Sequence, residues 1–426
     1  MNFTKICVLG LGYIGLPTAS TFATSGLKVI GVDVNQKIVN GLQNGEVHIY
    51  EPGIRTLVQA AIQSENLVIA DHPQQADAFI IAVPTPFYGE KKADLSFVKS
   101  AAESIVPHIQ KGNLVVLEST SPPRTTIDIL VPILEKSGLT AGEDFYVAYS
   151  PERVLPGQIL RELIENARVI GGIDEQSAEV GKELYQIFVK GEIITTTATT
   201  AEMVKLMENT YRDVNIAIAN EFARLADRFG VDAWEAIDIA NLHPRVNILR
   251  PGPGVGGHCI SVDPWFLVEA APDITPLIHT ARNVNDAQPD YVVDLINRIL
   301  GGFQGKQITI LGLAYKPDVD DLRESPAVEV AHKLALQGAI VTAYEPYKPD
   351  FVLQGVSMAS SLDEAIIEAE ILVLLVNHTN FRKLDPGKLL EKTTARIMLD
   401  TVGGWKPDVW QSAGFSTHRL GVSESD

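Results

Sequence analysis

The sequence predicts an α/β fold in which two doubly wound parallel-sheet domains are joined by a helical middle domain. Three observations support this prediction: short β-branched runs alternate with segments of helical period in the first half, the alternation returns after Gly305, and a long helical pattern separates the two. Such alternation is typical of βαβ units, whose parallel strands are covered by helices on both faces. We place the domains at 1–198, 199–300 and 301–426.

Five short apolar runs are the expected strands of the first domain. They are residues 6–9, 29–32, 79–83, 114–117 and 146–149. Four of them lead into polar loops that contain Gly or Pro, with the sequences GLGYIG, VPTPF, ESTSPP and YSPER. Because ligands of open α/β sheets bind outside the carboxyl ends of the strands, we expect these loops to line one crevice.

The helical pattern at 199–229 has no Pro or Gly and predicts a long helix. More helical sequence extends to about residue 241, and the loop PGPGVGGHC at 251–259 follows. The strands expected in the last domain are residues 308–311, 340–343, 371–376 and 397–399.

Composition narrows the possible functions. The 426 residues are 46% hydrophobic and 21% charged, which fits an ordinary globular protein of several domains. With 35 Lys and Arg against 53 Asp and Glu, the net charge of −18 argues against nucleic acid as a partner, so an anionic ligand needs a local cationic pocket.

Cysteine usage and hydropathy bear on the compartment. Two cysteines, Cys7 and Cys259, build no disulfide framework, and no apolar run is long enough for membrane insertion. The short apolar run near the N-terminus does not resemble a signal peptide. We expect a cytoplasmic protein.

A dinucleotide-binding pattern follows the first expected strand. Gly10, Gly12 and Gly15 form G-x-G-x-x-G between a strand and a helix, and Asp33 ends the second strand. The glycines allow close approach of a pyrophosphate, and Asp33 can bind a ribose 2′-hydroxyl, so this Rossmann-like pattern predicts NAD rather than NADP. The alternative is a plain glycine turn with Asp33 as a helix cap.

Cys259 is the candidate nucleophile. The glycines beside it leave the thiol open, and a thiolate that attacks an aldehyde forms a thiohemiacetal, whose further oxidation gives a thioester. From the loop alone, a packed structural cysteine is an equal alternative. Cys7 lies in an expected strand and is interpreted as a core residue. His258 neighbours Cys259 in sequence, and such neighbours seldom face each other.

Lys205, Asn209 and Arg212 share one stripe of the expected long helix. The stripe could face an anionic substrate or a developing alkoxide, or it could be a solvated face that pairs with Glu202, Glu208 and Asp213. Carboxylates that could act on a water or orient the lysine come from nearby loops. These are Glu152, beside Arg153, and Asp263. The nine histidines show no metal-binding spacing, and we predict no metal site.

Together these motifs resemble the UDP-glucose/GDP-mannose dehydrogenase family, whose members oxidise a nucleotide-sugar alcohol to a carboxylate with two NAD. The matching blocks run almost from end to end. They are GLGYIGLP at 10–17, VPTP at 83–86, EST at 118–120, SPER at 150–153, the Lys and Asn at 205 and 209, GGHC at 256–259, VDP at 262–264 and GLAYKPDVDDLRES at 312–325.

The resemblance implies a role for each matching residue. Cys259 would be the nucleophile and Lys205 the polar catalyst at the sugar 6-hydroxyl, with Asn209 stabilising the oxyanion and Asp263 assisting Lys205. Glu152 would activate water for thioester hydrolysis, and Thr120 would lie near the nicotinamide. Implied cofactor contacts are Gly10, Gly12, Tyr13, Ile14, Gly15, Asp33, Thr85, Thr120 and Arg323. Implied substrate contacts are Arg153, Val154, Lys205, Asn209, Arg212, His243, Arg245, Gly256, Tyr315 and Lys316.

Within the family, blocks such as HPRVNILRPGPGVGGHCISVDPWF at 243–266 look most like the members that oxidise UDP-N-acetyl-D-mannosamine. The resemblance also implies a homodimer in which Arg245 serves the neighbouring subunit. Val402 stands where a basic residue is expected. Open alternatives are a UDP-N-acetylglucosamine or UDP-glucose 6-dehydrogenase, a two-electron hydroxyacid dehydrogenase, and a non-catalytic NAD-binding protein.

Overall fold

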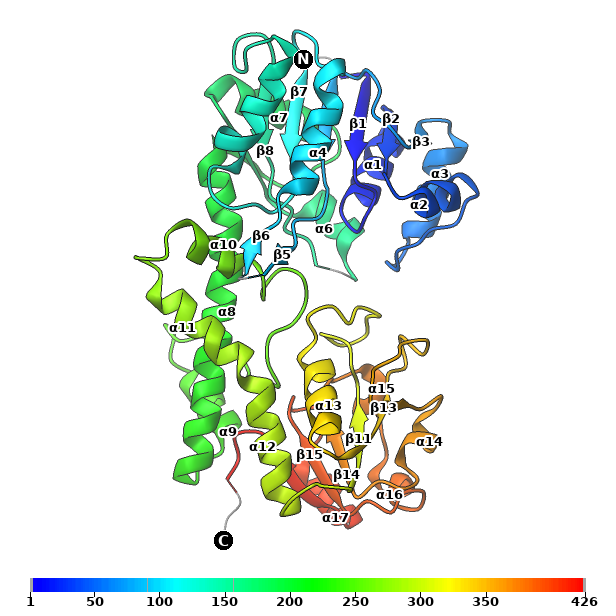
Figure 1. Ribbon diagram of the computed structural model, residues 1–426, viewed down its shortest axis with the longest axis vertical. Helices are drawn as coiled ribbons and strands as arrows, with labels where there is room; N and C mark the ends of the chain where they lie inside the picture. The colour runs from blue at the N-terminus through cyan, green and yellow to red at the C-terminus, as the bar shows by residue number, and fades with distance from the viewer. Residues whose placement is uncertain (1–2, 90, 156, 424–426) are drawn as a thin grey trace. The chain divides into compact units, whose positions relative to one another are not determined.

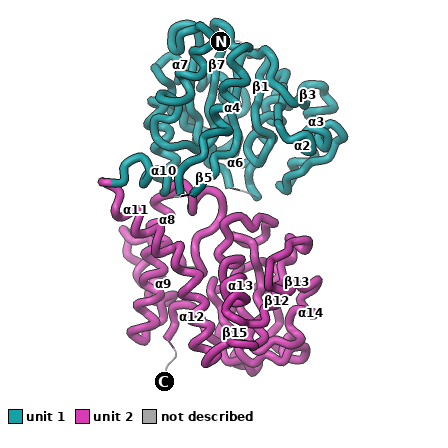
Figure 2. Tube along the Cα trace, viewed as in Figure 1, with its two compact units in different colours: residues 1–208, 265–272 teal, residues 209–264, 273–426 magenta. Residues whose placement is uncertain are grey.

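The computed structural model describes residues 3–89, 91–155 and 157–423. The chain divides into two compact units, coloured separately in Figure 2. Unit 1 consists of residues Met1–Glu208 and Trp265–Pro272, and unit 2 of Asn209–Pro264 and Asp273–Asp426. The boundary passes through the long helix α8 (Ala198–Phe229), whose beginning belongs to unit 1 and whose remainder belongs to unit 2.

Unit 1 is built on an eight-stranded sheet with the order β10-β9-β8-β7-β4-β1-β2-β3. Figure 1 labels β1, β2, β3, β7 and β8 of this sheet. The strands are β1 Lys5–Leu9, β2 Lys28–Val32, β3 Leu67–Ala70, β4 Ala78–Ile81, β7 Leu114–Leu117, β8 Tyr146–Tyr149, β9 Arg168–Gly172 and β10 Ile193–Thr197. A separate antiparallel pair is formed by β5 (Phe87–Tyr88) and β6 (Lys92–Ala93). The five strands expected from sequence in this domain are present, and the four loops named above follow carboxyl ends at one edge of the sheet.

Two strands of this sheet differ from the all-parallel expectation. β9 pairs with β8 in the antiparallel direction, and β10 runs parallel to β9. The reason is the short connection after β8, which stays at the carboxyl edge and contains only α6 (Ile159–Glu165). The chain therefore re-enters the sheet from that edge, and Arg168, the first residue of β9, lies there.

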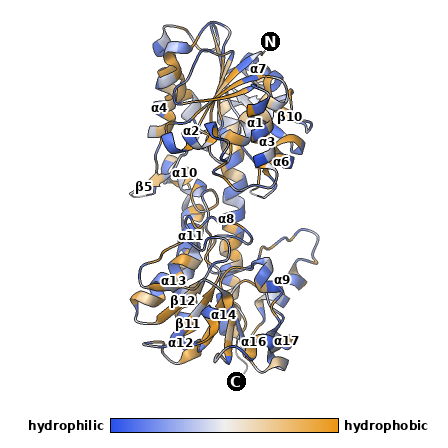
Figure 3. Ribbon diagram, turned by 90° about the vertical axis from the view of Figure 1, so that its right-hand side faces the viewer, coloured by the Kyte–Doolittle hydropathy of each residue, from blue (hydrophilic) through white to orange (hydrophobic). Residues whose placement is uncertain are grey.

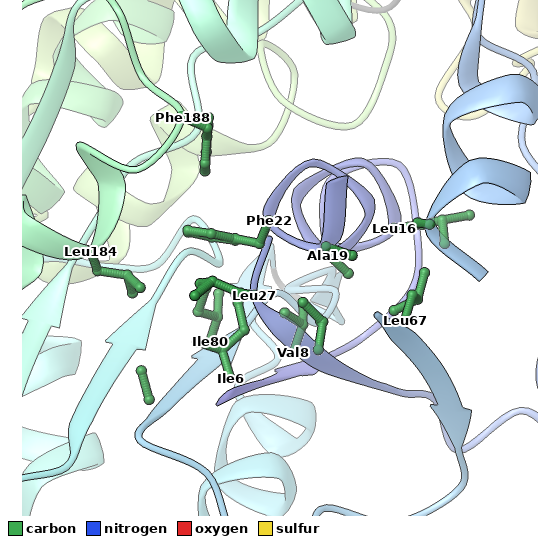
Figure 4. Close-up of a cluster of buried hydrophobic side chains, with 14 of the residues drawn as sticks. Ile6, Val8, Leu16, Ala19, Phe22, Leu27, Leu67, Ile80, Leu184 and Phe188 are labelled. Carbon is green, nitrogen blue, oxygen red and sulfur yellow. The ribbon is translucent and has the colours of Figure 1, made fainter. Parts of the chain in front are cut away.

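Helices cover both faces of the sheet, so alternate residues of the central strand enter two different cores. Ile6 and Val8 of β1 pack in one cluster, which Figure 4 shows with Phe22 of α1, and Cys7 and Leu9 pack in the other. The remaining helical segments of unit 1 are α1 Gly15–Thr24, α2 Gln36–Gln43, α3 Ile54–Gln63, α4 Ser96–Ile105, η1 Val106–His108, η2 Thr126–Leu130, α5 Val131–Leu134, η3 Glu135–Ser137 and α7 Glu175–Tyr185.

Cys7 is a core residue, as expected. Its side chain is fully buried, and burial raises the pKa of its thiol to about 11. The thiol is therefore protonated at neutral pH and packs as a small apolar group.

The middle of the chain is helical. The long helix expected at 199–229 is α8, and it has a buried face and an exposed one. The other helices of this region are α9 Ala233–Ala240, α10 Asp263–Ala270, α11 Pro276–Asp286 and α12 Gln288–Leu300.

Unit 2 contains a six-stranded, fully parallel sheet with the order β13-β12-β11-β14-β15-β16. Its strands are β11 Gln307–Leu311, β12 Ile340–Tyr344, β13 Val356–Met358, β14 Ile371–Leu374, β15 Ile397–Asp400 and β16 Ser416–Arg419. Its helices are α13 Pro326–Leu336, α14 Leu362–Ile366, α15 Thr379–Arg382, α16 Pro386–Leu390 and α17 Pro407–Ala413. In Figure 3 the central strands are mainly orange and the surrounding helices carry blue segments, as expected for a sheet buried on both faces.

The fold class is confirmed: two doubly wound sheets and a helical middle with one long helix. The small pair of β5 and β6 was not anticipated, and neither were five strands of the two large sheets, namely β3, β9, β10, β13 and β16. Four of these are short or polar strands near the sheet edges, and β9 contains two glycines, so none gives a clear alternating pattern. Among the described residues, no helix is both long and apolar enough to span a bilayer.

Candidate active site

The glycine turn after β1 has the geometry that a dinucleotide requires. Gly10 has φ +92° and donates its N–H to the carbonyl of Val32 at 2.8 Å, and a Cβ on Gly10 would lie 2.5 Å from the carbonyl oxygen of Ala82. A Cβ on Gly15 would collide with the carbonyl of Gly10. A Cβ on Gly12 would meet no atom within 4 Å, so the turn leaves open space beside its backbone. The residues present therefore fit a bound pyrophosphate.

Asp33 closes the same turn. Its Oδ2 accepts the N–H of Leu11 at 3.0 Å, and its Oδ1 accepts that of Asn35 at 2.9 Å. The cap of helix α2 is Asn35, whose side chain accepts the N–H of Lys37, so Asp33 does not cap that helix. Nearby, burial lowers the pKa of His48 although Asp33 acts in the opposite direction. Tyr13 and Ile14, between the glycines and α1, are half-buried.

The loops after β4 and β7 are joined by hydrogen bonds. The Thr85 hydroxyl donates to the carbonyl of Thr120 at 2.6 Å, and the Ser119 hydroxyl donates to the carbonyl of Val83 at 2.7 Å. Thr85 and Thr120, both expected near the cofactor, are therefore brought together at the carboxyl edge of the sheet.

Glu152 is buried just after β8. Its Oε2 accepts a hydrogen bond from Arg168 at 2.8 Å, and its Oε1 accepts the backbone N–H of Arg153 at 2.8 Å. The Arg153 guanidinium pairs with Glu208 at 2.6 Å and donates to the carbonyl of Ala167. Val154 is half-buried and packs against the core of unit 1.

Lys205 of α8 has a buried side chain, with 8% exposed. The three carboxylates that could have paired with the stripe of Lys205, Asn209 and Arg212 have other partners. Glu202 accepts the N–H groups of Arg124 and Thr126, Glu208 pairs with Arg153, and Asp213 pairs with Arg282. The structure therefore does not support the salt-bridge interpretation of the stripe.

In unit 2, a chain of contacts links α8 to the cysteine loop. Asn209 is buried and donates from Nδ2 to Oδ2 of Asp263 at 2.5 Å. The backbone N–H of Asp263 donates to the carbonyl of Cys259 at 2.8 Å, which makes the start of α10 continuous with the cysteine turn. Cys259 is exposed and lies in the turn that leads into α10, four residues before the helix begins at Asp263.

The glycines of GGHC allow close backbone packing. A Cβ on Gly256 would lie 2.5 Å from the carbonyl oxygen of Glu324, and one on Gly257 would lie 2.7 Å from the ring of Tyr315. The N–H of Gly257 donates to the carbonyl of Arg323 at 3.2 Å. Unit 2 thus brings together the GGHC and GLAYKPDVDDLRES motifs. His258 is partly buried, and burial and the charge of Arg323 lower its pKa.

Two asparagines of α8 hold the loop that leads to GGHC. Asn215 accepts the N–H of Leu249 at 2.9 Å and donates to the carbonyl of Asn247 at 2.8 Å. Asn220 accepts the N–H of Gly252 at 3.0 Å. Sequence reasoning missed these residues because an asparagine on a helix is usually a surface residue.

The remaining expected substrate residues lie in unit 2. Arg212, His243 and Arg245 are exposed, Lys316 places its Nζ 5.9 Å from the ring centre of Tyr315, and Arg323 pairs with Asp321 at 2.6 Å. The expected cations therefore divide between the units, with Arg153 and Lys205 in unit 1 and the other four in unit 2. Their convergence on one diphosphate stays a prediction.

Val402 lines a groove in unit 2 together with Arg250 and Arg419. Two cations therefore lie beside the position where a basic residue is expected. Among the described residues, no group of His, Cys, Asp and Glu side chains is arranged to hold a metal ion.

Comparison with known proteins agrees with this geometry. Three models of the UDP-glucose/GDP-mannose dehydrogenase family match the chain in order: the NAD binding domain at 4–189, the central domain at 199–287 and the UDP binding domain at 309–407. The chain is 51% identical to the UDP-N-acetyl-D-mannosamine dehydrogenase of Methanocaldococcus jannaschii over 98% of this chain and 96% of the relative. It is 48% identical to the NDP-N-acetyl-D-galactosaminuronic acid dehydrogenase of Ralstonia nicotianae over 95% and 97%.

Solved structures give the same result. The UDP-D-ManNAc dehydrogenase of Pyrococcus horikoshii has a TM-score of 0.92 at 39% identity, with 99% of this chain and 100% of that chain covered. The UDP-N-acetyl-mannosamine dehydrogenase of Staphylococcus aureus has a TM-score of 0.90 at 42% identity, with 98% and 99% covered. The fold and the dinucleotide turn define an NAD-dependent dehydrogenase. The chain belongs to the UDP-glucose/GDP-mannose dehydrogenase family, and NAD is its cofactor.

Proposed function

We propose that the protein oxidises C6 of UDP-N-acetyl-D-mannosamine from the primary alcohol to the carboxylate, giving UDP-N-acetyl-D-mannosaminuronate. The observation that carries the choice of substrate is the 51% identity, over nearly the whole chain, to a relative of that activity. The relative at 48% identity has N-acetyl-D-galactosaminuronic acid in its name, which makes a nucleotide-linked N-acetyl-D-galactosamine the second candidate.

NAD supplies a two-electron hydride acceptor for each oxidation, so one alcohol, two NAD⁺ and one water give one carboxylate, two NADH and three protons. In the first oxidation, Lys205 takes the role of polar catalyst at the 6-hydroxyl and Asn209 stabilises the oxyanion. Asp263 assists Lys205. The buried bond between Asn209 and Asp263 supports this assignment because it fixes both side chains.

Cys259 acts next. Its sulfur adds to the aldehyde carbon and the aldehyde oxygen takes up a proton, which gives a thiohemiacetal. Removal of a hydride and a proton converts this adduct to a thioester on the same sulfur. The exposed position of Cys259 in the turn before α10 supports its role as nucleophile.

Glu152 completes the reaction. Its carboxylate takes one proton from water, the water oxygen bonds to the thioester carbon, and the C–S bond breaks to release the Cys259 thiolate and the uronic acid, which gives its remaining proton to solvent. The buried and hydrogen-bonded state of Glu152 supports a role that needs a fixed carboxylate. Thr120 lies near the nicotinamide in this proposal.

The cofactor and substrate contacts are part of the same proposal. NAD contacts are Gly10, Gly12, Tyr13, Ile14, Gly15, Asp33, Thr85, Thr120 and Arg323. Sugar and diphosphate contacts are Arg153, Val154, Lys205, Asn209, Arg212, His243, Gly256, Tyr315 and Lys316, with Arg245 supplied by a second subunit. The functional segments are 1–198, 199–300 and 301–426.

We infer a homodimer from an exposed apolar stripe on α8. Tyr211, Ile218, Phe222, Leu225 and Phe229 recur at helical spacing and are 41% to 71% exposed in the single chain. Arg245 is also exposed. Mixing Arg245→Ala subunits with Cys259→Ala subunits, each inactive alone, should restore about one active site per heterodimer. Absence of recovery would place Arg245 in its own subunit's site.

The decisive measurement is the ratio of NADH to sugar consumed. The proposal requires two NADH and one uronate per UDP-N-acetyl-D-mannosamine, and a ratio of one without acid would contradict it. A panel that includes UDP-N-acetylgalactosamine, UDP-N-acetylglucosamine and UDP-glucose tests the choice of sugar, and preference for any of these would reassign the substrate. We place this reaction in the cytoplasm, in surface polysaccharide biosynthesis, which predicts loss of the uronate from the polysaccharide when the gene is deleted.

A further inference from the structure

A buried charged cluster lies behind Glu152 at the carboxyl edge of the unit 1 sheet. Glu118 follows β7, Ser150 and Glu152 follow β8, and Tyr185 ends α7. Arg168 joins them because β9 runs antiparallel to β8 and begins at this edge. Arg168, Glu118 and Tyr185 have no role in the reaction proposed above.

Arg168 bridges the two carboxylates. One guanidinium nitrogen, Nη2, donates to Glu152 at 2.8 Å. The other, Nη1, donates to the Ser150 hydroxyl at 2.8 Å and to Oε1 of Glu118 at 3.3 Å. The side chains of Arg168 and Glu118 are 5% and 0% exposed, so water does not compete for these bonds.

Tyr185 anchors the far side of the cluster. Its hydroxyl donates to Oε1 of Glu118 at 2.5 Å, and the Arg168 guanidinium lies 4.4 Å from its ring centre. The guanidinium is therefore fixed by hydrogen bonds at its ends and by the aromatic face beside it. This arrangement leaves Arg168 one orientation, with Nη2 directed to Glu152.

The cluster contains one cation and two carboxylates, so the two acids compete for one positive charge. Glu118 is the weaker competitor, because its Oε2 is buried with no hydrogen-bond partner among the described residues, and burial raises its pKa to about 7. Glu152 also accepts the N–H of Arg153. Two further charged side chains lie near Glu152: Arg153, which pairs with Glu208, and Glu162 of α6, which accepts the N–H of Leu155. A proton held by the cluster therefore resides on Glu118.

We propose that Arg168 is a positioning residue for thioester hydrolysis: held by Glu118 and Tyr185, it fixes the orientation of the Glu152 carboxylate. This inference rests on the proposed function, in which Glu152 takes the proton from water. Loss of Arg168 should affect hydrolysis and not the two oxidations, since those steps use Lys205, Asn209 and Cys259.

The test compares two phases of NADH formation. In Arg168→Gln, the first turnover should still release about two NADH per site, and steady-state turnover should fall about 10- to 100-fold as the thioester accumulates. Arg161→Gln is the matched control because Arg161 is an exposed arginine of unit 1, and both phases should stay unchanged.

A second variant tests the inference if Arg168→Gln does not fold. Arg168→Gln leaves two buried carboxylates without a cation, whereas Glu118→Gln with Arg168→Gln removes one charge of each sign and should show the same two-phase behaviour. Loss of the first two NADH in a folded variant, or turnover equal to wild type, would overturn the inference. A wild-type yield of one NADH per sugar would instead contradict the proposed function, so the two failures are distinguishable.

Discussion

The turns that follow the first strand of each sheet share a backbone geometry and differ in what they leave open. Gly10 after β1 and Gly312 after β11 have φ +92° and +90°, and each donates its N–H to the end of the neighbouring strand. A Cβ on either would lie 2.5 Å from the next strand end, at Ala82 or at Val376. The same close approach of strands therefore requires glycine at both places.

An acidic residue directly follows the second strand in both sheets. Asp33 follows β2 and accepts the N–H of Leu11, and Glu345 follows β12 and accepts the N–H groups of Leu313 and Ala314. Glu345 is 1% exposed and also binds His378 at 3.1 Å. Asp33 is only half-buried.

Helix placement completes the contrast. α1 begins at Gly15 within the glycine turn, whereas α13 begins at Pro326 after a long segment that packs on the GGHC loop. Unit 1 therefore presents to a dinucleotide a helix N-terminus and the half-buried carboxylate of Asp33. In unit 2 the corresponding carboxylate is that of Glu345, which is buried and bound to His378. Sheet topology alone therefore does not make a cofactor site.

The largest expected effect is on the rate of uronate formation, with no change in NAD affinity. Cys259→Ser should lower uronate formation by roughly three orders of magnitude or more, because a hydroxyl is a much poorer nucleophile than a thiolate. NAD affinity, measured by calorimetry, should stay unchanged because the dinucleotide turn lies in unit 1. Cys7→Ala is the control and should retain activity. Uronate formation at the wild-type rate in Cys259→Ser would make this cysteine structural.

Exchanging side chains into the two turns tests the contrast directly. Gly12→Val should fold normally, since its Cβ meets no protein atom, and should weaken NAD binding by about 3 kcal/mol because valine fills the space for the pyrophosphate. Gly312→Val should instead lower the free energy of unfolding by about 1–3 kcal/mol, since its φ is left-handed and its Cβ meets Val376. Equal NAD affinity in Gly12→Val and wild type would place the cofactor elsewhere.

Replacing Asp33 and replacing Glu345 should have different effects, the first on cofactor binding and the second on stability. Asp33→Ala should weaken NAD binding by about 1–3 kcal/mol and reduce the preference for NAD over NADP, because the ribose contact and its negative charge are lost. Glu345→Ala should lower the melting temperature and leave that preference unchanged. The measurement is kcat/KM with each cofactor. An unchanged ratio in Asp33→Ala would mean that the dinucleotide pattern has been misassigned.

The smallest effect concerns acid stability. Burial alone would raise the pKa of Glu345, but its bonds to His378, Leu313 and Tyr347 lower it overall. A depressed carboxyl pKa stabilises the fold above the unfolded pKa, and this contribution disappears as the pH falls below about 4. Glu345→Gln should therefore lose less stability between pH 7 and 3.5 than the wild type, as measured by the free energy of unfolding at each pH. A Glu370→Gln control, at an exposed carboxylate, should keep the wild-type pH dependence.

Local patterns explain what could be predicted from sequence. The glycine turn and Asp33 lie on adjacent strands of one βαβ unit, so spacing alone places them together. The cluster of Glu118, Arg168 and Tyr185 depends on an antiparallel strand whose direction no local pattern indicates. The hydrogen bond between Glu345 and His378 likewise joins side chains that follow two different strands.

The asparagines of α8 have a consequence for how the chain tolerates change. A helix rises about 1.5 Å per residue, so Asn215 and Asn220 are fixed about 7.5 Å apart along its axis. Their side chains accept the backbone N–H groups of Leu249 and Gly252. The spacing of the two asparagines along the helix therefore sets the length of loop between these two contacts. Surface loops usually accept insertions, but one residue added between Leu249 and Gly252 would break the hydrogen bond to one asparagine or the other. We therefore expect a fixed length between these contacts in any functional variant.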